Sequence, residues 1–409
     1  MRRRLPPVDI IAVTTITIAG SFANGAVAPL LGEVRDTFGL SYVALAFITG
    51  GFAIARVILD IPGGSIADRF SARPVFLVAG IAVVAGVMLT ALSPSYPVLV
   101  AGRLLNGMGA IVGSIAATVY IARRVSPEHR GGALGGVTAA SLLGGFLSPA
   151  LVGAVASAAG WRWGVAITVV PALLSLMLVG LLVSETVSSG PKPPPRRLFT
   201  LQAFYAPRRM WSVYAVGTLV GLGTFGMKST VLPLYGSEQL GLDPSTVGTT
   251  ITIGAALGFP ISIAAGMASD RFGRRAVFIP CAIILAAVGI SINFATSLPT
   301  YVAVALGFSI DGATASAIRT MVVDRAQPDR LGAALGTSGF MKDLGMAADP
   351  FILGAIIGGW GFWGAGGMIA AAALAGVAAV LVAGETAPRH AAASVLIEVP
   401  ASPRPRTDG

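Results

Sequence analysis

The residues of this chain that could do chemistry are charged side chains placed inside long apolar stretches. Asp311, Lys342 and Asp343 lie well inside two such stretches, ~15 Å from an end at a helical rise of 1.5 Å per residue. A charge at that depth is costly and usually faces a cavity or a partner. A carboxylate there can exchange a proton, because burial favours its protonated form and a nearby lysine its ionised form. We therefore predict a proton- or substrate-binding site at these residues, against the alternative of a static ion pair.

Three more cations lie inside apolar stretches. Arg56 is four residues before Asp60, so the two can pair along one helix face as a structural pair or a gate element. Arg103 either takes part in coupling and substrate contact or clamps a neighbouring helix through a carbonyl. Lys228 lies nearer the end of its stretch. We assign these cations, like the first group, to substrate binding or proton coupling.

The sequence offers little for catalysis. The chain has two histidines, His129 and His390, outside the apolar stretches, and one cysteine, Cys281. This supply excludes a His/Cys zinc cluster, and the sequence contains no Walker A motif and no hydrolase or metalloprotease motif. We expect no enzyme, no metal and no cofactor, and energy that comes from a gradient.

The apolar stretches themselves predict an all-α membrane protein. Of 409 residues, 55% are hydrophobic and 11% charged, against about 25% charged in soluble domains. A helix needs ~20 apolar residues to cross a bilayer. Twelve stretches are long enough, at roughly 9–31, 42–62, 74–94, 97–121, 132–156, 161–183, 211–235, 245–266, 276–294, 300–322, 332–357 and 362–384.

The distribution of basic residues predicts the orientation. Most of the 28 lysines and arginines lie in segments on the same side as the N-terminus, and such segments are cytoplasmic under the positive-inside rule. Both termini are then cytoplasmic. The net charge of +10 is a topology signal with some attraction to membrane lipids, and does not indicate nucleic acid. We expect a multi-pass protein of the inner (cytoplasmic) membrane.

A basic, proline-rich stretch divides the chain. Residues 185–210 read as a solvated cytoplasmic linker between an N-terminal six-helix bundle, 1–184, and a C-terminal one, 211–384. The tail, 385–409, is rich in Pro, Ala and Arg and is predicted to be disordered.

The two halves repeat each other in register. The segment 64–73 matches 266–275, the segment 127–135 matches 328–336, and Pro149 matches Pro350, at offsets of 201 or 202 residues. Two related bundles around a central site are what alternating access requires. The repeat therefore favours a transporter.

Three motifs show a family resemblance. Gly64-Ser-Ile-Ala-Asp68-Arg69-Phe-Ser-Ala-Arg73 resembles the signature loop of the major facilitator superfamily, and the copy with Asp270 and Arg271 is closer still. The run from Arg103 to Gly109 is similar to the R-x-x-x-G-x-G motif of that family. The resemblance implies twelve helices in two pseudo-symmetric bundles. It implies a cytoplasmic gate built on the residues Gly64, Asp68, Arg69, Arg73, Asp270 and Arg271.

The fifth stretch adds a weaker resemblance. Gly144 to Gly153, with Pro149 inside, resembles the G-x-x-x-G-P-x-x-G-G motif of drug/proton antiporters and departs from it at Ser148 and Val152. Pro149 is either a packing kink or a gating hinge or seal.

We therefore predict a secondary active transporter, with proton-coupled efflux of a small organic solute as the leading hypothesis. A proton-coupled importer of an organic anion is the alternative, motivated by the four cations in apolar stretches. A transport-inactive sensor or assembly protein is less favoured. The expected partners are a small-molecule solute, protons and membrane lipids, and the expected state is a monomer.

Overall fold

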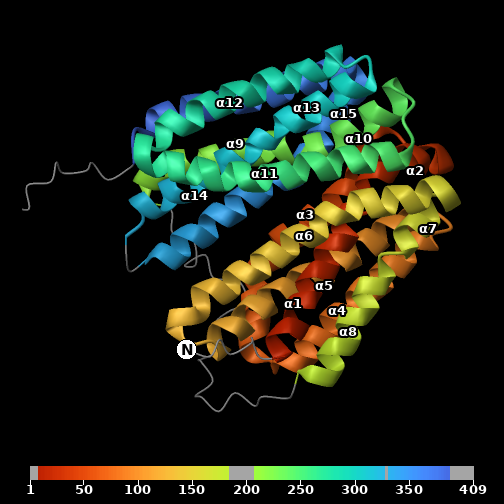
Figure 1. Ribbon diagram of the computed structural model, residues 1–409, viewed down its shortest axis with the longest axis vertical. Coiled ribbons are helices and arrows are strands. Elements are labelled where there is room, and N and C mark those ends of the chain that lie inside the picture. Colours follow the sequence, from red (N-terminus) through yellow and green to blue (C-terminus); the bar gives the residue numbers. More distant parts are fainter. Residues whose placement is uncertain (1–7, 184–206, 328–329, 387–409) are drawn as a thin grey trace, which may run out of the picture.

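The computed structural model describes residues 8–183, 207–327 and 330–386, and this part of the chain is built of helices (Figure 1). Residues 185–206 of the predicted linker and 387–409 of the predicted tail lie outside it, so the predicted domain division stays a prediction. The first half contains α1 (Val8–Gly25), η1 (Ala28–Leu30), α2 (Leu31–Phe38), α3 (Tyr42–Arg69), α4 (Ala72–Ala91), α5 (Tyr96–Arg124), α6 (Pro127–Ala159), α7 (Trp161–Ala166) and α8 (Val169–Leu182).

The second half has a similar order with more interruptions. It contains η3 (Arg208–Met210), α9 (Trp211–Gly226), η4 (Met227–Val231), α10 (Leu232–Leu234), η5 (Tyr235–Gln239), α11 (Pro244–Phe272), α12 (Arg274–Ser291), η6 (Ile292–Phe294), α13 (Leu298–Gly307), η7 (Phe308–Ile310), α14 (Asp311–Arg325) and α15 (Leu331–Ala383). The segments η4 and η5 are π-helical.

Corresponding helices of the two halves begin with the same chemistry. The Ser41 hydroxyl accepts a hydrogen bond from the Ala44 backbone at the start of α3. The Asp243 carboxylate accepts bonds from Ser245 and Thr246 at the start of α11. Such caps satisfy amide groups that have no partner in the first turn. The sequence repeat is thus present in the local structure.

Eleven helices in the described part are long and apolar enough to cross a membrane. The last, Ala333–Ala383, has 51 residues and bends sharply at Gly361, where φ is 65° and ψ is −165°. Glycine tolerates this backbone conformation because it has no Cβ. Gly361 lies in the short gap between the predicted stretches 332–357 and 362–384.

The helices form two groups that follow the chain (Figure 1). In the first half α4 packs on α5 and α1 on α6, and in the second α9 and α12 pack on α15. Two long contacts join the groups: α6 with α11, and α3 with α15. Small residues allow such close approach between helices.

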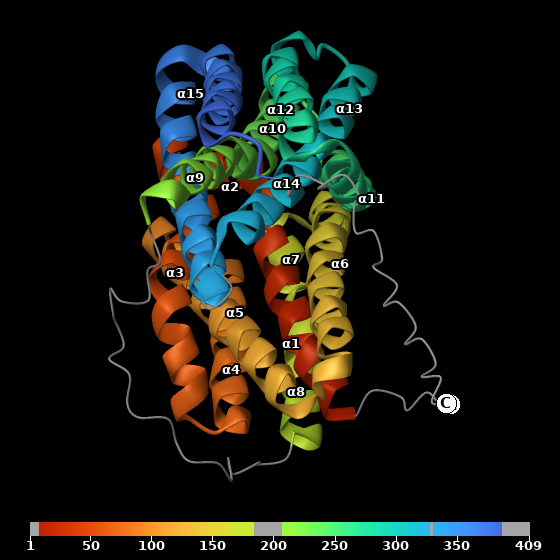
Figure 2. The same cartoon turned by 90° about the vertical axis from the view of Figure 1, so that its left-hand side faces the viewer.

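The two groups touch at one end and separate at the other. At the end with α2 and α10 (Figure 1), a Cβ added to Gly354 would lie 2.6 Å from the Tyr42 carbonyl oxygen of the other group. At the end near the N-terminus, a Cβ at Gly136 or Gly336 would meet nothing within 4 Å. Figure 2 looks at the molecule from the end near the N-terminus, with most helices of the second half above those of the first. We call these the closed end and the open end.

Candidate functional site

Among the described residues, four charged side chains of the apolar stretches meet in two close ion pairs. The Lys228 ammonium of η4 lies 2.6 Å from the Asp311 carboxylate at the start of α14. The Arg56 guanidinium of α3 lies 2.8 Å from the Asp343 carboxylate of α15. The Arg56–Asp343 pair joins the two halves of the chain, whereas the Lys228–Asp311 pair lies within the C-terminal half.

The structure thus distributes the predicted midplane cluster over two pairs. Asp311 is paired with Lys228, which we had placed nearer the membrane surface. Asp343 is 1% exposed and pairs with Arg56, while Lys342 is 3.9 Å away from its second oxygen. The expected partner of Arg56, Asp60, has a side chain outside the described residues.

Arg103 binds backbone carbonyls of two neighbouring helices. Its guanidinium donates to the oxygens of Ala23 and Asn24 on α1 and of Ile48 on α3, at 3.0, 3.4 and 3.2 Å. The residue is 3% exposed. This is the geometry of the clamp that we considered as the alternative to a coupling role, and the coupling role stays a prediction.

Pro149 lies where α6 meets α11. The Thr252 hydroxyl of α11 accepts a hydrogen bond from the Ala150 backbone at 3.1 Å and donates one to the Phe146 carbonyl at 2.7 Å. A proline frees backbone groups of its helix, and a neighbouring threonine can satisfy them. Here that threonine comes from the other half, so the proline turn belongs to the contact between the halves.

A polar contact closes the same end of the molecule. The Glu238 carboxylate of η5 accepts bonds from Arg35 of α2 at 2.7 Å and from the Tyr42 hydroxyl of α3 at 2.6 Å. Nearby, Ser157 of α6 donates to the Asp243 carboxylate at 2.9 Å. Hydrogen bonds from Thr246 and Ser157 lower the pKa of Asp243 and so favour its ionised form.

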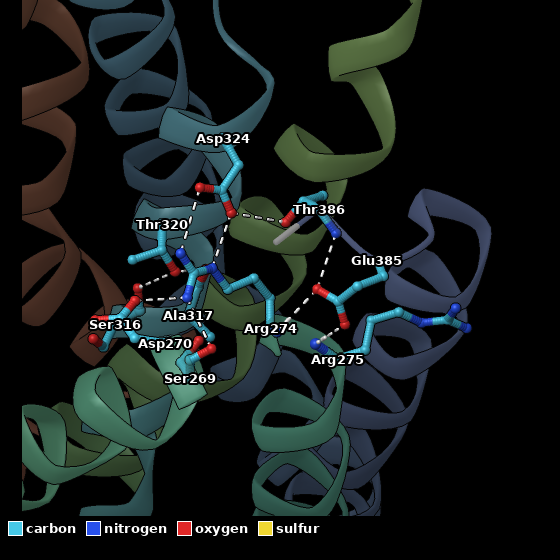
Figure 3. A network of polar contacts seen from close by, with 10 residues as sticks. All are labelled: Ser269, Asp270, Arg274, Arg275, Ser316, Ala317, Thr320, Asp324, Glu385 and Thr386. Carbon is cyan, nitrogen blue, oxygen red and sulfur yellow. Dashed lines mark hydrogen bonds and ion pairs between the residues drawn. The ribbon is translucent and has the colours of Figure 1, made fainter. Parts of the chain in front are cut away.

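The open end carries the second signature loop and a charged network (Figure 3). Arg274 lies 2.7 Å from the Asp270 carboxylate and 2.9 Å from that of Asp324. Glu385 accepts bonds from the Arg274 and Arg275 backbone at 3.0 and 3.2 Å, at the start of α12. The predicted gate residue Asp270 pairs with Arg274 at the start of α12, and its gating role stays a prediction.

Other predicted gate residues have different positions. Arg271 stacks on Phe272, with the guanidinium carbon 5.4 Å from the ring centre. Arg73 donates to the Gly180 carbonyl at 2.7 Å. The surroundings of Gly64 and the side chains of Asp68 and Arg69 are outside what the structure describes, so their gating role stays a prediction.

Some residues of these contacts were missed by sequence reasoning. Arg274 stands in the signature loop beside the residues chosen, and its position before a long apolar run was a usable signal. Arg35 and Glu238 are ordinary charges near helix ends, and 203 positions separate them. Nothing in their local sequence indicates that they meet. In the described part of the chain, no group of three or more potential metal ligands occurs.

The two groups of long apolar helices and the buried charges at their contact are those of a helical membrane protein, and comparisons with known proteins give its family. The sequence profile of the Major Facilitator Superfamily matches residues 13–350 and 215–407. The chain belongs to this superfamily, whose members are transporters rather than enzymes, and it is a multi-pass membrane protein.

Individual relatives differ in what they carry. The chain is 26% identical over 193 residues to the MFS antiporter QDR3 of Candida albicans. The matched region covers 47% of this chain and 26% of that protein. It is 27% identical to the mouse facilitated glucose transporter member 10, over 72% of this chain and 60% of that one. The chain thus spans less than two thirds of either relative. It is 23% identical to a nitrite extrusion protein of Bacillus subtilis, over 86% and 87% of the two chains.

Solved structures share the fold. A bacterial homolog of the human lysosomal transporter Spinster, in an inward-facing and unoccupied conformation, has a TM-score of 0.74 at 16% identity, covering 93% of this chain and 96% of the other. A D-xylose-proton symporter has a TM-score of 0.70 at 19% identity, covering 93% and 98%. These identities establish the fold alone.

Proposed function

We propose that this protein is a proton-coupled exporter that exchanges a small organic solute for protons by alternating access. The observation that supports coupling is the Arg56–Asp343 pair, which joins the two halves through a carboxylate that is 1% exposed. A proton on Asp343 would remove the attraction to Arg56. Binding a proton and separating the halves would then be linked events.

Twelve crossings agree with the shape of α15. The segments 331–360 and 362–383 on either side of Gly361 each exceed the ~20 residues that a crossing needs. The open end then faces the cytoplasm with both termini, as the positive-inside rule requires. We propose that the protein acts as a monomer in the cytoplasmic membrane, with the bundle boundaries at 1–184 and 211–384.

The direction of transport rests on the α6 motif and on the antiporter and extrusion proteins among the relatives. Import of an organic anion is less supported, because Arg56 and Lys228 are bound by carboxylates and Arg103 by carbonyls. In the export hypothesis protons move opposite to the solute, and in the import hypothesis they move with it.

Proteoliposomes with an imposed pH gradient test the proposal. Solutes are first selected by a thermal-shift screen on the purified protein, since a ligand stabilises the folded state that binds it. The expected result is solute movement opposite to proton movement, abolished by collapsing the gradient. Movement in the same direction would establish the importer, and solute movement that ignores the gradient would overturn coupling.

A further inference from the structure

Asp349 is a buried carboxylate that takes part in neither of these two ion pairs. Asp349 lies in α15 immediately before Pro350 and is 0% exposed. Its Oδ2 atom accepts a hydrogen bond from the Gly226 backbone at 2.5 Å, and its Oδ1 atom is buried without a partner. The sequence places this residue on the same helical stripe as Lys342, but the structure gives it no ion pair within the described residues.

Asp311 and Asp343 differ from Asp349 because each of them has a cation close by. Asp311 has the Lys228 ammonium at 2.6 Å, and Asp343 has the Arg56 guanidinium at 2.8 Å. A cation at that distance stabilises the ionised form of a carboxylate. Asp349 is as deeply buried as Asp343 and has a single backbone amide in place of a cation.

Two elements contact α15 at this turn: α9 with η4, which contributes Gly226, and α3, where a Cβ on Gly50 would lie 3.7 Å from Pro350. The helix α9 contains no charged residue. The charge of η4 is Lys228 and the described charge of α3 is Arg56. Both are engaged by other carboxylates.

On α15 itself, Lys342 and Asp343 lie two helical turns before Asp349, and the Lys342 ammonium is 3.9 Å from an Asp343 oxygen. An ionised carboxylate that is buried with neither a cation nor a full set of hydrogen-bond donors is far less stable than its neutral acid. The described contacts of Asp349 therefore favour the neutral form.

We propose that Asp349 is a proton-binding residue of this transporter and carries its proton in the conformation seen here. The proposal deepens the proton-coupled function and rests on it. The ligand is the proton alone, held on a carboxyl group whose other oxygen is bound by Gly226.

Asp349 lies close to the π-helical turn that carries Lys228 and to the contact between the two halves. Gly226 immediately precedes the π-helical turn Met227–Val231, which carries Lys228. Such turns are frequent at functional sites. On its other side, Pro350 faces Gly50 in the contact between the halves. Loss of the proton would leave a negative charge on α15 beside Gly226 and next to Pro350, which lies at that contact.

Infrared spectroscopy of the purified, reconstituted protein at neutral pH tests the proposal without a solute. A protonated carboxyl group in an apolar environment has a carbonyl-stretch band that an ionised carboxylate lacks. We expect this band in the original protein, its loss in Asp349→Asn, and its retention in the matched control Asp343→Asn on the same helix. Asp349→Glu, which keeps a carboxyl group, is expected to shift the band.

A band that persists in the folded Asp349→Asn protein, or an original protein without the band, would overturn the assignment. If Asp349→Asn does not fold, the unshifted band in Asp349→Glu serves as the contrary result. The transport assay separates the two proposals. A band that belongs to Asp349 in a protein whose solute flux ignores the pH gradient would overturn proton coupling and leave the proton site standing.

Discussion

At the scale of single residues, two arginines that look alike in the sequence differ in burial and in the groups that they bind. Arg103 and Arg56 both lie inside apolar helices. Arg103 is 3% exposed and binds three carbonyls within its own half. The Arg56 side chain is 36% exposed and binds Asp343 of the other half. The first arrangement holds helices together, and the second can change when the halves move.

Arg103→Lys is expected to destabilise the protein although it keeps the charge. One ammonium cannot reach carbonyls on α1 and α3 as the guanidinium fork does, and each buried carbonyl left without a donor costs about 1–3 kcal/mol. Thermal unfolding of the purified protein, followed by tryptophan fluorescence, measures the loss. A variant with unchanged unfolding but no transport would show instead that Arg103 serves coupling.

Arg56→Gln is expected to destabilise the contact between the halves by leaving Asp343 without its cation. Breaking a fully buried pair costs about 3–5 kcal/mol, and the cost here is lower because the Arg56 side chain is partly exposed. Adding Asp343→Asn removes the uncompensated charge, so the double variant should regain stability. A double-mutant cycle on unfolding temperatures checks this, and strictly additive losses would show that the pair has no energetic coupling.

At the scale of elements, the contacts between the halves are built twice on the same plan. In α6, Pro149 is followed four residues later by Gly153, which faces the start of α11. In α15, Pro350 is followed by Gly354, which faces the start of α3. The proline weakens each helix where the small glycine allows the other half to approach.

Thr252→Val is expected to weaken the contact of α6 with α11. The change keeps the volume and leaves the Ala150 amide and the Phe146 carbonyl without the hydroxyl that serves both. A loss of about 1–2 kcal/mol shifts an equilibrium roughly 5- to 30-fold. Spin labels at positions 136 and 336, at the open end, measure the shift as a shorter distance between them.

The labelled variants also carry Cys281→Ser, because this change removes the one cysteine of the chain that a spin label would otherwise modify. Thr250→Val is the matched control, since that buried hydroxyl donates to the Thr246 carbonyl of its own helix. Equal distance distributions in the two variants would remove Thr252 from the set of residues that hold the halves together.

Gly354→Ala is expected to separate the two halves where α15 meets the start of α3. Its Cβ would lie 2.6 Å from the Tyr42 carbonyl oxygen, so the backbone of one helix must move. Gly359→Ala on the same helix meets nothing within 4 Å and is the control. The label distance at positions 136 and 336 should shorten in the first variant and stay unchanged in the second.

The sequence predicts helices and their repeat well because apolar length, caps and matched motifs are local properties. It gives the correspondence of Pro149 with Pro350, and the structure shows both at contacts between the halves. It does not predict that Arg56 meets Asp343 or that Thr252 reaches α6. Those pairings depend on which face each helix turns inward, and small apolar residues on every face of α6 and α15 obscure that choice.

At the scale of the whole molecule, closure at one end and separation at the other are consequences of one relative position of the two halves. The closed end is held by Glu238 with Arg35 and Tyr42, by Asp243 with Ser157, and by the two proline contacts. The open end has no such contact at Gly136 and Gly336. If the halves move as rigid bodies, opening one end must close the other.

Glu238→Gln tests this movement. The amide cannot attract Arg35 as a carboxylate does, so the closed end loses a charge-assisted contact worth about 1.5–3 kcal/mol. One label pair, at positions 136 and 336, reports on the open end, and a second, at Asp36 and Thr296, reports on the closed end. Rigid rocking requires that the first distance shorten in the same fraction of molecules in which the second lengthens. A longer second distance with an unchanged first would mean that α2 detaches locally while the halves stay in place, and alternating access would then need a hinge within a bundle.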